Sequence, residues 1–370
     1  MNLAGYEVDD AILLPVRRDW GIGIVGCGGI VNYAHLPAYQ ASGFRVVACH
    51  DRDMTAAERT AAAHGIPRVA ATLDDLLADD DVEIVDIAVT PEAQVAIAER
   101  AAEAGKHLLC QKPLAPGYPA AARLVSRARD EGVKLAVNQQ MRWDAGIRVA
   151  HQLIAQGALG QPADARIEVS VRTPWHLWPW MARSPRLEVM YHSIHYHDSL
   201  RFLFGDPERV TAVHGRFPGQ PETGETRTAT VLEYESGLIT LVDVNHHNWS
   251  DDAYAHFRFL GSGGIITGTI GLLYDYPHGR VDTLSYQANA EPRAWHEASL
   301  QTRWIPDAFA GPMASLMEAI ESGGQPETSG EDNLGTLRVV HAAYRSAVEG
   351  RSIAPAAIAL DEGPARQGRH

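Results

Sequence analysis

The sequence of 370 residues has few cysteines, no long apolar run and no excess of basic residues. Its three cysteines, Cys27, Cys49 and Cys110, are too few and too scattered for a disulfide framework, and each ends or borders a short apolar run. We therefore expect buried free thiols and a reducing compartment, the cytoplasm. No run is long enough to cross a bilayer, so no membrane partner is expected.

The formal net charge is −14, which argues against nucleic acid or an anionic membrane as a general partner. The length predicts two domains. Residues 1–19 are acidic early and basic late and lack the pattern of a secretory signal. We expect them to form an N-terminal arm that lies on the surface of the protein or on a partner subunit.

Between residues 20 and 145, apolar strand-like runs alternate with helical patterns. This alternation predicts a doubly wound parallel sheet, in which ligands bind at the carboxyl ends of the strands. The expected strands lie at 22–25, 44–49, 69–72, 82–89, 106–110 and 134–138, with helices at 33–41, 56–64, 73–77, 92–104 and 119–131.

The pattern changes near residue 150. A helix at 149–156 precedes several strand candidates in which apolar and polar residues alternate, and this predicts a sheet with one face open to water or to a partner. Domains are expected at 20–145 and 146–355, with a tail at 356–370 and with C-terminal helices able to pack back on the first domain. The strand candidates are 164–172, 209–215, 227–234, 238–244, 256–261 and 264–270, and 309–350 is helical with a break at 323–326.

Gly26, Cys27 and Gly28 form the G-x-G start of a dinucleotide fingerprint. The first glycine permits a tight turn, the second lets the backbone approach a pyrophosphate, and the N–H groups of the next helix would hold the anion. The usual third small position falls on Val31, so the motif is incomplete. Glycine-rich turns also occur for purely steric reasons.

Asp51 ends the second predicted strand, about 20 residues after Gly28, where a carboxylate binds the adenosine ribose. Its charge favours NAD over NADP because it repels a 2′-phosphate, whereas the adjacent Arg52 could offset that charge, so NADP stays open. Asp53 is the better candidate for capping the next helix.

Thr90, Lys112 and Asn138 also follow predicted strands, so they could face the same crevice as Asp51. A surface lysine is usually only solvated. Lys112 differs because it stands at the carboxyl edge of a nucleotide-binding sheet, next to Pro113, whose ring stiffens the backbone.

Residues 191–198 read Y-H-S-I-H-Y-H-D and lead into a helix that ends at Gly205. On a helix, His192, His195 and Ser199 share one face. Nearby His246 and His247 raise the hypothesis of a metal site, but the sequence has no H-E-x-x-H and no paired cysteines, so none is expected. A histidine that exchanges a proton with a substrate hydroxyl is favoured, while His192 or His197 could be core residues.

Residues 173–180 read T-P-W-H-L-W-P-W. Three tryptophans are unusual as core filler because each indole N–H needs a partner. The segment could offer flat aromatic faces to a sugar or could form a subunit interface, and the sequence leaves both open.

Together these segments resemble the Gfo/Idh/MocA family of glucose–fructose oxidoreductase, inositol dehydrogenase and their relatives, from Gly21 to Gly350. G-I-V-G-C-G-G-I resembles the family's phosphate turn, and G-K-H-L-L-C-Q-K-P-L resembles its E-K-P motif. M-Y-H-S-I-H-Y-H-D-S-L-R-F-L-F-G resembles its D-x-G-x-H-x-x-D segment. The resemblance implies an N-terminal Rossmann domain and a C-terminal α/β domain with a large open, mostly antiparallel sheet that forms homodimers or homotetramers.

The resemblance also places the family's catalytic lysine on Lys112 and its catalytic histidine on His195. The chain departs from the pattern with Tyr191 in place of the catalytic Asp, and with Gln111 for Glu, Ser193 for Gly and Val95 for a frequent His. Tyr191 could donate a hydrogen bond, and His192 could supply a second titrating group.

The sequence therefore predicts hydride transfer between a secondary alcohol of a sugar, polyol or glycoside and NAD, with NADP possible. Two alternatives are a sugar-modifying enzyme that oxidises transiently and retains its NAD, and a non-catalytic NAD-binding sensor. The residues assigned to catalysis are Lys112, His195 and Tyr191. Those assigned to the cofactor are Gly26, Gly28, Gly29, Ile30, Asp51, Arg52, Thr90, Pro91, Lys112 and Asn138, and those assigned to the substrate are His192, Asn138, Arg142, Trp175, Trp178 and Asp198.

Overall fold

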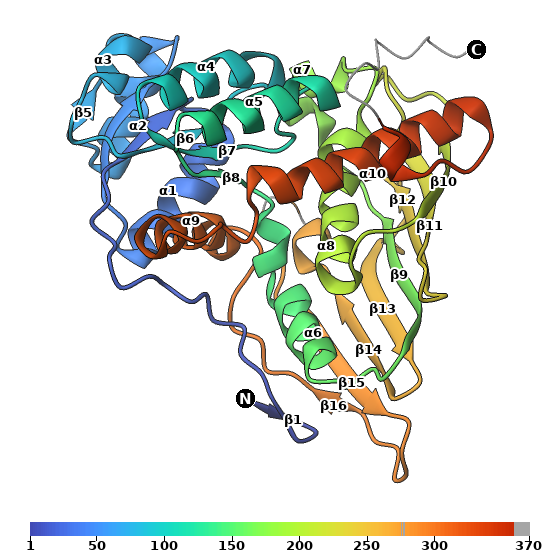
Figure 1. Cartoon of the computed structure of the whole chain (residues 1–370). Coiled ribbons are helices and arrows are strands. Elements are labelled where there is room, and N and C mark those ends of the chain that lie inside the picture. Colours follow the sequence, from blue (N-terminus) through green and yellow to red (C-terminus); the bar gives the residue numbers. More distant parts are fainter. Residues whose placement is uncertain (275, 277, 359–370) are drawn as a thin grey trace. The chain divides into compact units, whose positions relative to one another are not determined.

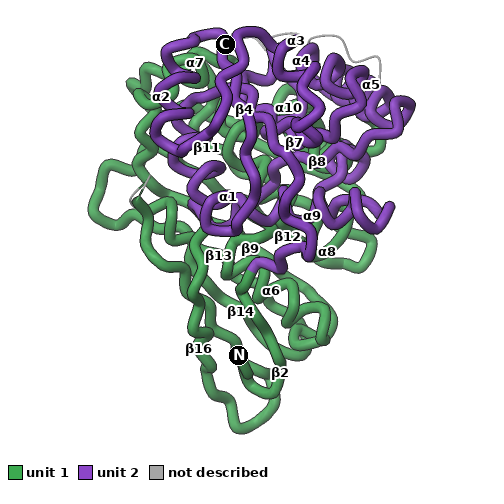
Figure 2. The backbone as a smooth tube through the Cα atoms, turned by 90° about the vertical axis from the view of Figure 1, so that its left-hand side faces the viewer, with its two compact units in different colours: residues 1–11, 141–304, 335–370 green, residues 12–140, 305–334 purple. Residues whose placement is uncertain are grey.

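The computed structural model describes residues 1–274, 276 and 278–358, and the chain divides into two compact units. The parallel-sheet unit comprises residues 12–140 and 305–334; the open-sheet unit comprises residues 1–11, 141–304 and the chain from 335 on. Figure 2 distinguishes the two units by colour. The expected tail at 356–370 lies outside the described residues from 359 on. Within the described residues, no helix is both long and apolar enough to span a membrane.

The parallel-sheet unit contains a six-stranded sheet in the order β5-β4-β3-β6-β7-β8, with every pair parallel. The predicted doubly wound sheet is thus confirmed. The strand order reverses beside β3, which makes the carboxyl ends of β3 and β6 a switch point where ligands bind in such folds. The strands are β3 (Ile22–Val25), β4 (Val46–His50), β5 (Arg68–Val69), β6 (Ile84–Ile87), β7 (His107–Cys110) and β8 (Leu135–Val137).

The helices of this unit begin with local sequence signals. Asp53 accepts a hydrogen bond from the Thr55 N–H and caps α2, as expected from the sequence. Before α1 the chain forms a π turn, Val31–His35, just ahead of Pro37, whose ring lacks an N–H and crowds the preceding turn. The helices are α1 (Leu36–Ser42), α2 (Met54–His64), α3 (Leu73–Leu77), α4 (Pro91–Glu103), α5 (Tyr118–Asp130) and α9 (Ala310–Ser322).

The open-sheet unit contains an eight-stranded sheet in the order β10-β11-β12-β9-β13-β14-β15-β16. All pairs are antiparallel except β12 with β9, so the predicted mostly antiparallel sheet is confirmed. The strands are β9 (Pro162–Ser170), β10 (Arg209–Gly215), β11 (Arg227–Glu233), β12 (Ile239–Asn245), β13 (Tyr254–Gly261), β14 (Gly264–Thr269), β15 (Thr283–Ala288) and β16 (His296–Glu297). The sequence did not predict β15. Apolar and polar residues alternate along part of this strand, but only Leu284 and Tyr286 are large and apolar.

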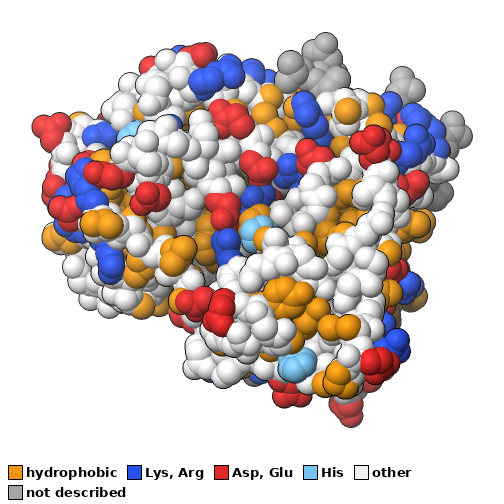
Figure 3. Space-filling model, turned by 60° about the horizontal axis from the view of Figure 1, so that its bottom comes forward, with side chains coloured by type: hydrophobic (Ala, Val, Ile, Leu, Met, Phe, Trp, Pro, Cys, Tyr) orange, Lys and Arg blue, Asp and Glu red, His pale blue; other side chains and the backbone are white. Residues whose placement is uncertain are grey.

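Helices cover one face of this sheet, and Figure 1 shows α6 and α8 lying over its strands. The other face leaves large apolar side chains exposed, among them Val213 at 70% and Ile239 at 53%. The helices are α6 (Ala145–Ala155), α7 (Pro179–Ala182), α8 (Ile194–Phe204) and α10 (Gly330–Glu349). The part of α10 from residue 335 on belongs to this unit. Elsewhere on the surface, the face in Figure 3 intermixes acidic and basic side chains.

Residues 1–11 pack against the rest of the open-sheet unit of the same chain. They form the short hairpin of β1 (Asn2–Leu3) and β2 (Tyr6–Glu7), and Leu3 and Val8 are buried. The Asp10 carboxylate accepts hydrogen bonds from the N–H groups of Gln301 and Thr302. The first part of the expected arm therefore lies on the surface of the open-sheet unit. The three cysteines are buried and free, as predicted.

The turn after β3 requires glycine at position 26. Gly26 has a φ of +97°, and a Cβ there would lie 2.4 Å from the carbonyl oxygen of Ala88, just beyond β6. Gly43, at the end of α1, also has a positive φ (+70°), but nothing lies within 4 Å of a Cβ built there.

We predict that Gly26→Ala destabilises the fold more than Gly43→Ala does. Both substitutions incur the left-handed backbone cost of about 1–2 kcal/mol, and only Gly26→Ala adds a clash with backbone. Denaturant unfolding measures the free energy of unfolding of each variant. Equal losses would contradict the steric account of this turn.

Candidate active site

The glycine turn and Asp51 form the first part of the site, in the parallel-sheet unit. Gly28 and Gly29 are exposed, and a Cβ at Gly28 would meet open space. The Cys27 N–H donates to Asp51 Oδ2 at 2.7 Å, and the Asp53 N–H donates to Asp51 Oδ1 at 2.8 Å. The sequence predicted that this turn and this carboxylate lie together, and the structure places them in direct contact.

This arrangement fits a dinucleotide. The open backbone at Gly28 lets a phosphate approach the start of the helical segment, where N–H groups favour an anion. Each oxygen of a carboxylate has two lone pairs, so Asp51 can still accept from ribose hydroxyls. Arg52 is exposed beside it, and Ile30 is half-buried. Thr90 is half-buried at the N-cap of α4 and makes no side-chain cap bond, while Pro91 is buried in the first turn.

Lys112 follows β7, and hydrogen bonds with Gln111 and Gln94 fix the backbone around it. The Lys112 N–H donates to Gln111 Oε1 at 2.8 Å. The buried amide of Gln94, from α4, donates to the carbonyl oxygens of Gln111 at 2.7 Å and Leu114 at 3.0 Å. Gln94 thus clamps the loop on both sides of Lys112. Sequence reasoning missed Gln94, although an amide on the apolar face of helix α4 was a detectable signal.

Desolvation lowers the pKa of Lys112 to about 7, although the residue as a whole is only half-buried. The ammonium group has lost much of its water, which disfavours the charged form. A lysine with this pKa exchanges its proton close to neutral pH, as a group that assists proton transfer must.

A buried polar network lies directly behind this loop. Asp86 Oδ2 in β6 contacts His35 Nδ1 at 2.7 Å and accepts from the Tyr39 hydroxyl at 2.8 Å. His35 Nε2 lies 3.2 Å from the amide nitrogens of both Gln111 and Asn138. Because Gln111 Oε1 already accepts from Lys112, its NH₂ faces His35, and this assigns the proton of the ring to Nδ1.

Asn138 is therefore placed inside this network and is fully buried. We assigned it from the sequence to cofactor and substrate. The network links the carboxyl ends of β6, β7 and β8 to the helix that follows the glycine turn. Asn138 Oδ1 has no hydrogen-bond partner among the described residues, and the assignment of Asn138 to the ligands stays a prediction. His35 and Asp86 were not recognised from the sequence because nothing local pairs them.

The histidine segment lies in the open-sheet unit. A π turn, Val189–Ser193, precedes α8, and such turns are frequent at functional sites. Tyr191 and His195 are buried at 6% and 5% exposure, while His192 is half-buried and more accessible. The edge of the His195 ring meets Trp304, with centroids 5.4 Å apart.

The tryptophan segment packs on this turn. Trp175 meets the rings of His192 and His246 at centroid distances of 4.9 and 5.4 Å, and Trp180 meets Tyr191 at 5.4 Å. Trp178 packs on Tyr276 instead. The structure thus brings together two segments that the sequence had singled out separately, and it associates the tryptophans with the histidines.

Arg142 and Asp198, both assigned to the substrate from the sequence, bind each other. Arg142 Nε and one terminal nitrogen lie 2.7 and 2.8 Å from the two oxygens of Asp198, and both side chains are buried. The Thr336 hydroxyl donates to Asp198 as well, at 2.6 Å. The pair joins the segment before α6 to α8, and its assignment to the substrate stays a prediction.

Within the described ranges, no group of three or more His, Cys, Asp or Glu side chains is arranged to hold a metal ion. The histidines near Asp198 and His246 instead make ring contacts and contacts with single carboxylates.

The sequence matches known families over both units. Residues 20–139 match an oxidoreductase family with an NAD-binding Rossmann fold, and residues 151–355 match the C-terminal α/β domain of the same family. A D-apiose dehydrogenase from Paraburkholderia graminis is 31% identical over 376 aligned residues, which cover 98% of each chain. A 1,5-anhydro-D-fructose reductase from Ensifer adhaerens is 29% identical over 89% of this chain and 97% of its own.

Solved structures share the fold. An oxidoreductase from Agrobacterium radiobacter, in complex with NAD+, L-tartaric acid and magnesium, superimposes with a TM-score of 0.82 at 26% identity. The match covers 92% of this chain and all of that one. On the two family matches and the similarity along the whole chain, this protein belongs to the Gfo/Idh/MocA family of oxidoreductases and has an NAD-binding Rossmann domain.

Proposed function

We propose that the protein is a sugar dehydrogenase that transfers hydride between a secondary alcohol of a carbohydrate and NAD. The observation that carries the proposal is Lys112, clamped at the carboxyl end of β7 in an NAD-binding domain and desolvated to a pKa of about 7. The names of the similar dehydrogenases and reductases support a sugar as the substrate.

The proposed chemistry divides between two residues. Bound nicotinamide supplies the hydride acceptor. His195 takes the proton of the reacting hydroxyl as general base, and Lys112 hydrogen-bonds the same oxygen and stabilises its developing negative charge. Tyr191 stands where the family usually has a catalytic Asp, and its hydroxyl serves as a further hydrogen-bond donor. Gly28 and Asp51 hold the phosphate and ribose of the cofactor.

Aromatic side chains suit the proposed carbohydrate. The faces of sugar rings carry C–H groups that pack on flat aromatic rings. The exposed Trp180 and the half-buried His192 provide such surfaces beside the turn that carries Tyr191, and the buried Trp175 packs edge-on against His192. On this proposal the tryptophan segment binds substrate, and its other use, a contact between subunits, stays open.

We also propose that subunits associate through the outer face of the eight-stranded sheet. On that face the exposed Ile239 and the half-buried Leu241 and Val231 project beside charged residues. A homodimer or homotetramer formed there would bury these apolar side chains.

We predict that the enzyme reduces NAD+ with one or more members of a panel of D-apiose, D-xylose and polyols, or oxidises NADH with 1,5-anhydro-D-fructose. Lys112→Met should lower kcat/KM at least ~100-fold, because the oxyanion loses its stabilising donor. Lys134→Met is the control and should leave activity unchanged, because Lys134 lies at the amino end of β8, whereas Lys112 lies at the carboxyl end of β7. Nicotinamide absorbance under steady turnover measures both variants.

Three other results of this assay would count against the proposal. Activity that survives in Lys112→Met would remove the proposed role of the lysine. Conversion of a sugar without net change in nicotinamide absorbance would favour the enzyme that retains its NAD. No turnover of any panel member despite tight NADH binding would favour a sensor.

We predict that Gln111→Glu moves the alkaline limb of the kcat/KM profile to higher pH by about one unit. An anion beside Lys112 favours the ammonium form and so raises its pKa, and the protonated donor then persists to higher pH. Rates across about pH 6–10 with the best panel substrate measure the shift. An alkaline limb that stays in place would show that Gln111 does not tune Lys112.

We predict that Leu241→Glu combined with Ile239→Glu lowers the oligomeric state, because two buried carboxylates per subunit cannot be accommodated in an apolar contact. Light scattering coupled to size exclusion gives the mass. Val348→Glu, at a 57% exposed position on α10, is the control and should keep the mass of the unmodified protein. An unchanged mass for the double variant would place the interface elsewhere.

A further inference from the structure

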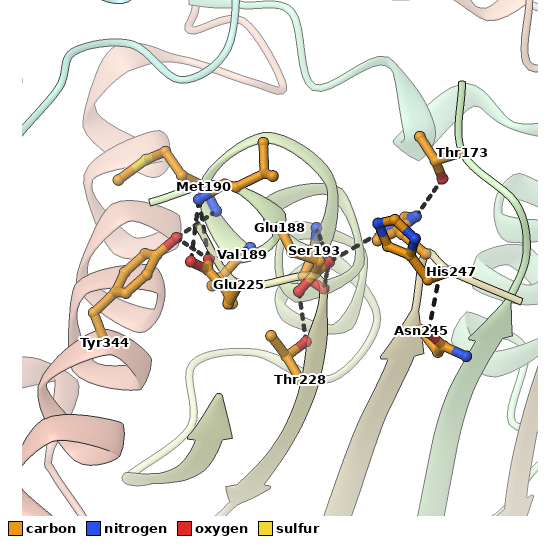
Figure 4. Close-up of polar contacts among 12 residues, drawn as sticks. Thr173, Glu188, Val189, Met190, Ser193, Glu225, Thr228, Asn245, His247 and Tyr344 are labelled. Atoms are coloured by element: carbon orange, nitrogen blue, oxygen red, sulfur yellow. Dashed lines mark hydrogen bonds and ion pairs between the residues drawn. The ribbon is translucent and has the colours of Figure 1, made fainter. Parts of the chain in front are cut away.

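A buried carboxylate, Glu188, lies immediately before the π turn that carries Tyr191 and His192. Its side chain is completely buried. The Ser193 N–H and hydroxyl donate to Glu188 Oε1 at 3.1 and 2.5 Å, and the Thr228 hydroxyl donates to Oε2 (Figure 4). Glu188 Oε1 also lies 3.5 Å from His246 Nε2, an ion-pair distance. The carboxylate therefore joins the turn to β11 and to the end of β12.

Glu188 is held in its charged form. Burial by itself would raise its pKa, but the contacts with His246, Ser193 and Thr228 outweigh burial and hold the pKa below its usual value. A buried anion of this kind is costly unless a partner compensates its charge.

The histidines near the Glu188 carboxylate differ in their pKa values and in their distance from it. Burial lowers the pKa values of His197 and His214 to about 4, so both are neutral near pH 7. His246 instead lies within ion-pair distance of the carboxylate. The other titratable groups that interact with Glu188 across the packed elements are Tyr196 on α8, Glu225 before β11 and Tyr344 on α10.

The contacts of Glu188 also fix the orientation of His246. Nε2 lies 3.5 Å from the carboxylate oxygen without forming a hydrogen bond, and because a lone pair on Nε2 would be repelled by that anion, we assign the ring proton to Nε2. On the other side of the ring, Nδ1 lies 2.6 Å from the Thr173 hydroxyl, and with the ring proton on Nε2 it accepts a hydrogen bond from that hydroxyl. The ring held in this way packs on His192 at a centroid distance of 4.6 Å and on Trp175 at 5.4 Å.

A second buried carboxylate supports the same turn. Glu225 accepts from the N–H groups of Leu187 and Val189 and from the Tyr344 hydroxyl (Figure 4). Glu225 contacts the first residues of the turn and Tyr344 on α10, and burial raises its pKa to about 7. Glu188 differs because it reaches both the turn and, through His246, the aromatic wall formed by Trp175, His192 and His246.

We infer that Glu188 is a positioning residue of the active site, and this inference rests on the proposed function. Glu188 holds His246 and the π turn, and the buried rings of His246 and Trp175 in turn hold the half-buried His192 in one fixed position toward the sugar. Glu188 itself does not touch substrate.

The test is Glu188→Gln, which keeps the size of the side chain and an acceptor for Ser193 but removes the charge. ¹⁵N NMR of the histidine rings, assigned with His246→Asn, reports which nitrogen of His246 carries the proton, and it needs no substrate. We expect the Nε2–H form in the unmodified protein and a mixture of forms in Glu188→Gln. With the best panel sugar, kcat/KM should fall about tenfold, the factor that corresponds to one pKa unit of lost charge interaction.

Thr228→Val is the matched control, because it removes a hydrogen bond to the same carboxylate but leaves the charge. It should keep the Nε2–H form of His246. Affinity for NADH should be unchanged in both variants, since the glycine turn lies in the other unit. A merely structural role would lower the melting temperature of both variants alike and leave the ring protonation of His246 unaltered.

An unaltered His246 ring in folded Glu188→Gln would overturn the inference, as would an unchanged kcat/KM. If Glu188→Gln does not fold, Thr173→Val provides the second variant. It removes the other ring contact of His246, and it should lower kcat/KM and change the ring form while Glu188 remains. Failure of the proposed function alone would appear as no sugar turnover by the unmodified protein, with the expected change in the His246 ring still present.

Discussion

The contact between the buried Asp86 carboxylate and His35 is the interaction on which the cofactor-binding unit depends. Neither side chain has access to water, so each must find its partners within the protein. Asp86 stands in the central strand β6, and His35 stands in the turn after the phosphate loop. Their pairing fixes the helix that follows Gly28 and, through Gln111, the backbone of Lys112. The site inherits its geometry from a core contact that touches no ligand.

The open-sheet unit follows the same principle with different residues. Glu188 and Glu225 are removed from water and are satisfied by backbone N–H groups of one turn, by hydroxyl groups and by His246. A π turn departs from regular helix geometry and is stabilised here by contacts with its side chains and backbone. In both units, buried acidic groups hold a functional loop in place more firmly than apolar packing alone could, since hydrogen bonds are directional.

Much of this architecture follows from local sequence patterns. Alternating strands and helices predicted the parallel sheet, and Gly26, Asp51 and Asp53 were recognised because their roles depend on spacing along the chain. Gln94, His35 and Glu188 were not recognised, because each acts through a residue far away in sequence. The same limit explains Arg142 and Asp198. The structure places their charges against each other, a pairing that no local pattern in the sequence indicates.

The order of segments in the two units has a consequence for biosynthesis. Strand β9, at Pro162–Ser170, pairs with β12 and β13, so the middle of the open sheet is not complete until the ribosome has passed residue 261. The parallel-sheet unit likewise receives α9, at Ala310–Ser322, long after its last strand has been made. Neither core can close while the first half of the chain emerges. Nascent chains therefore expose apolar sheet faces for many seconds at ordinary elongation rates of ~5–20 residues per second, which makes this fold a natural client for chaperones that bind during translation.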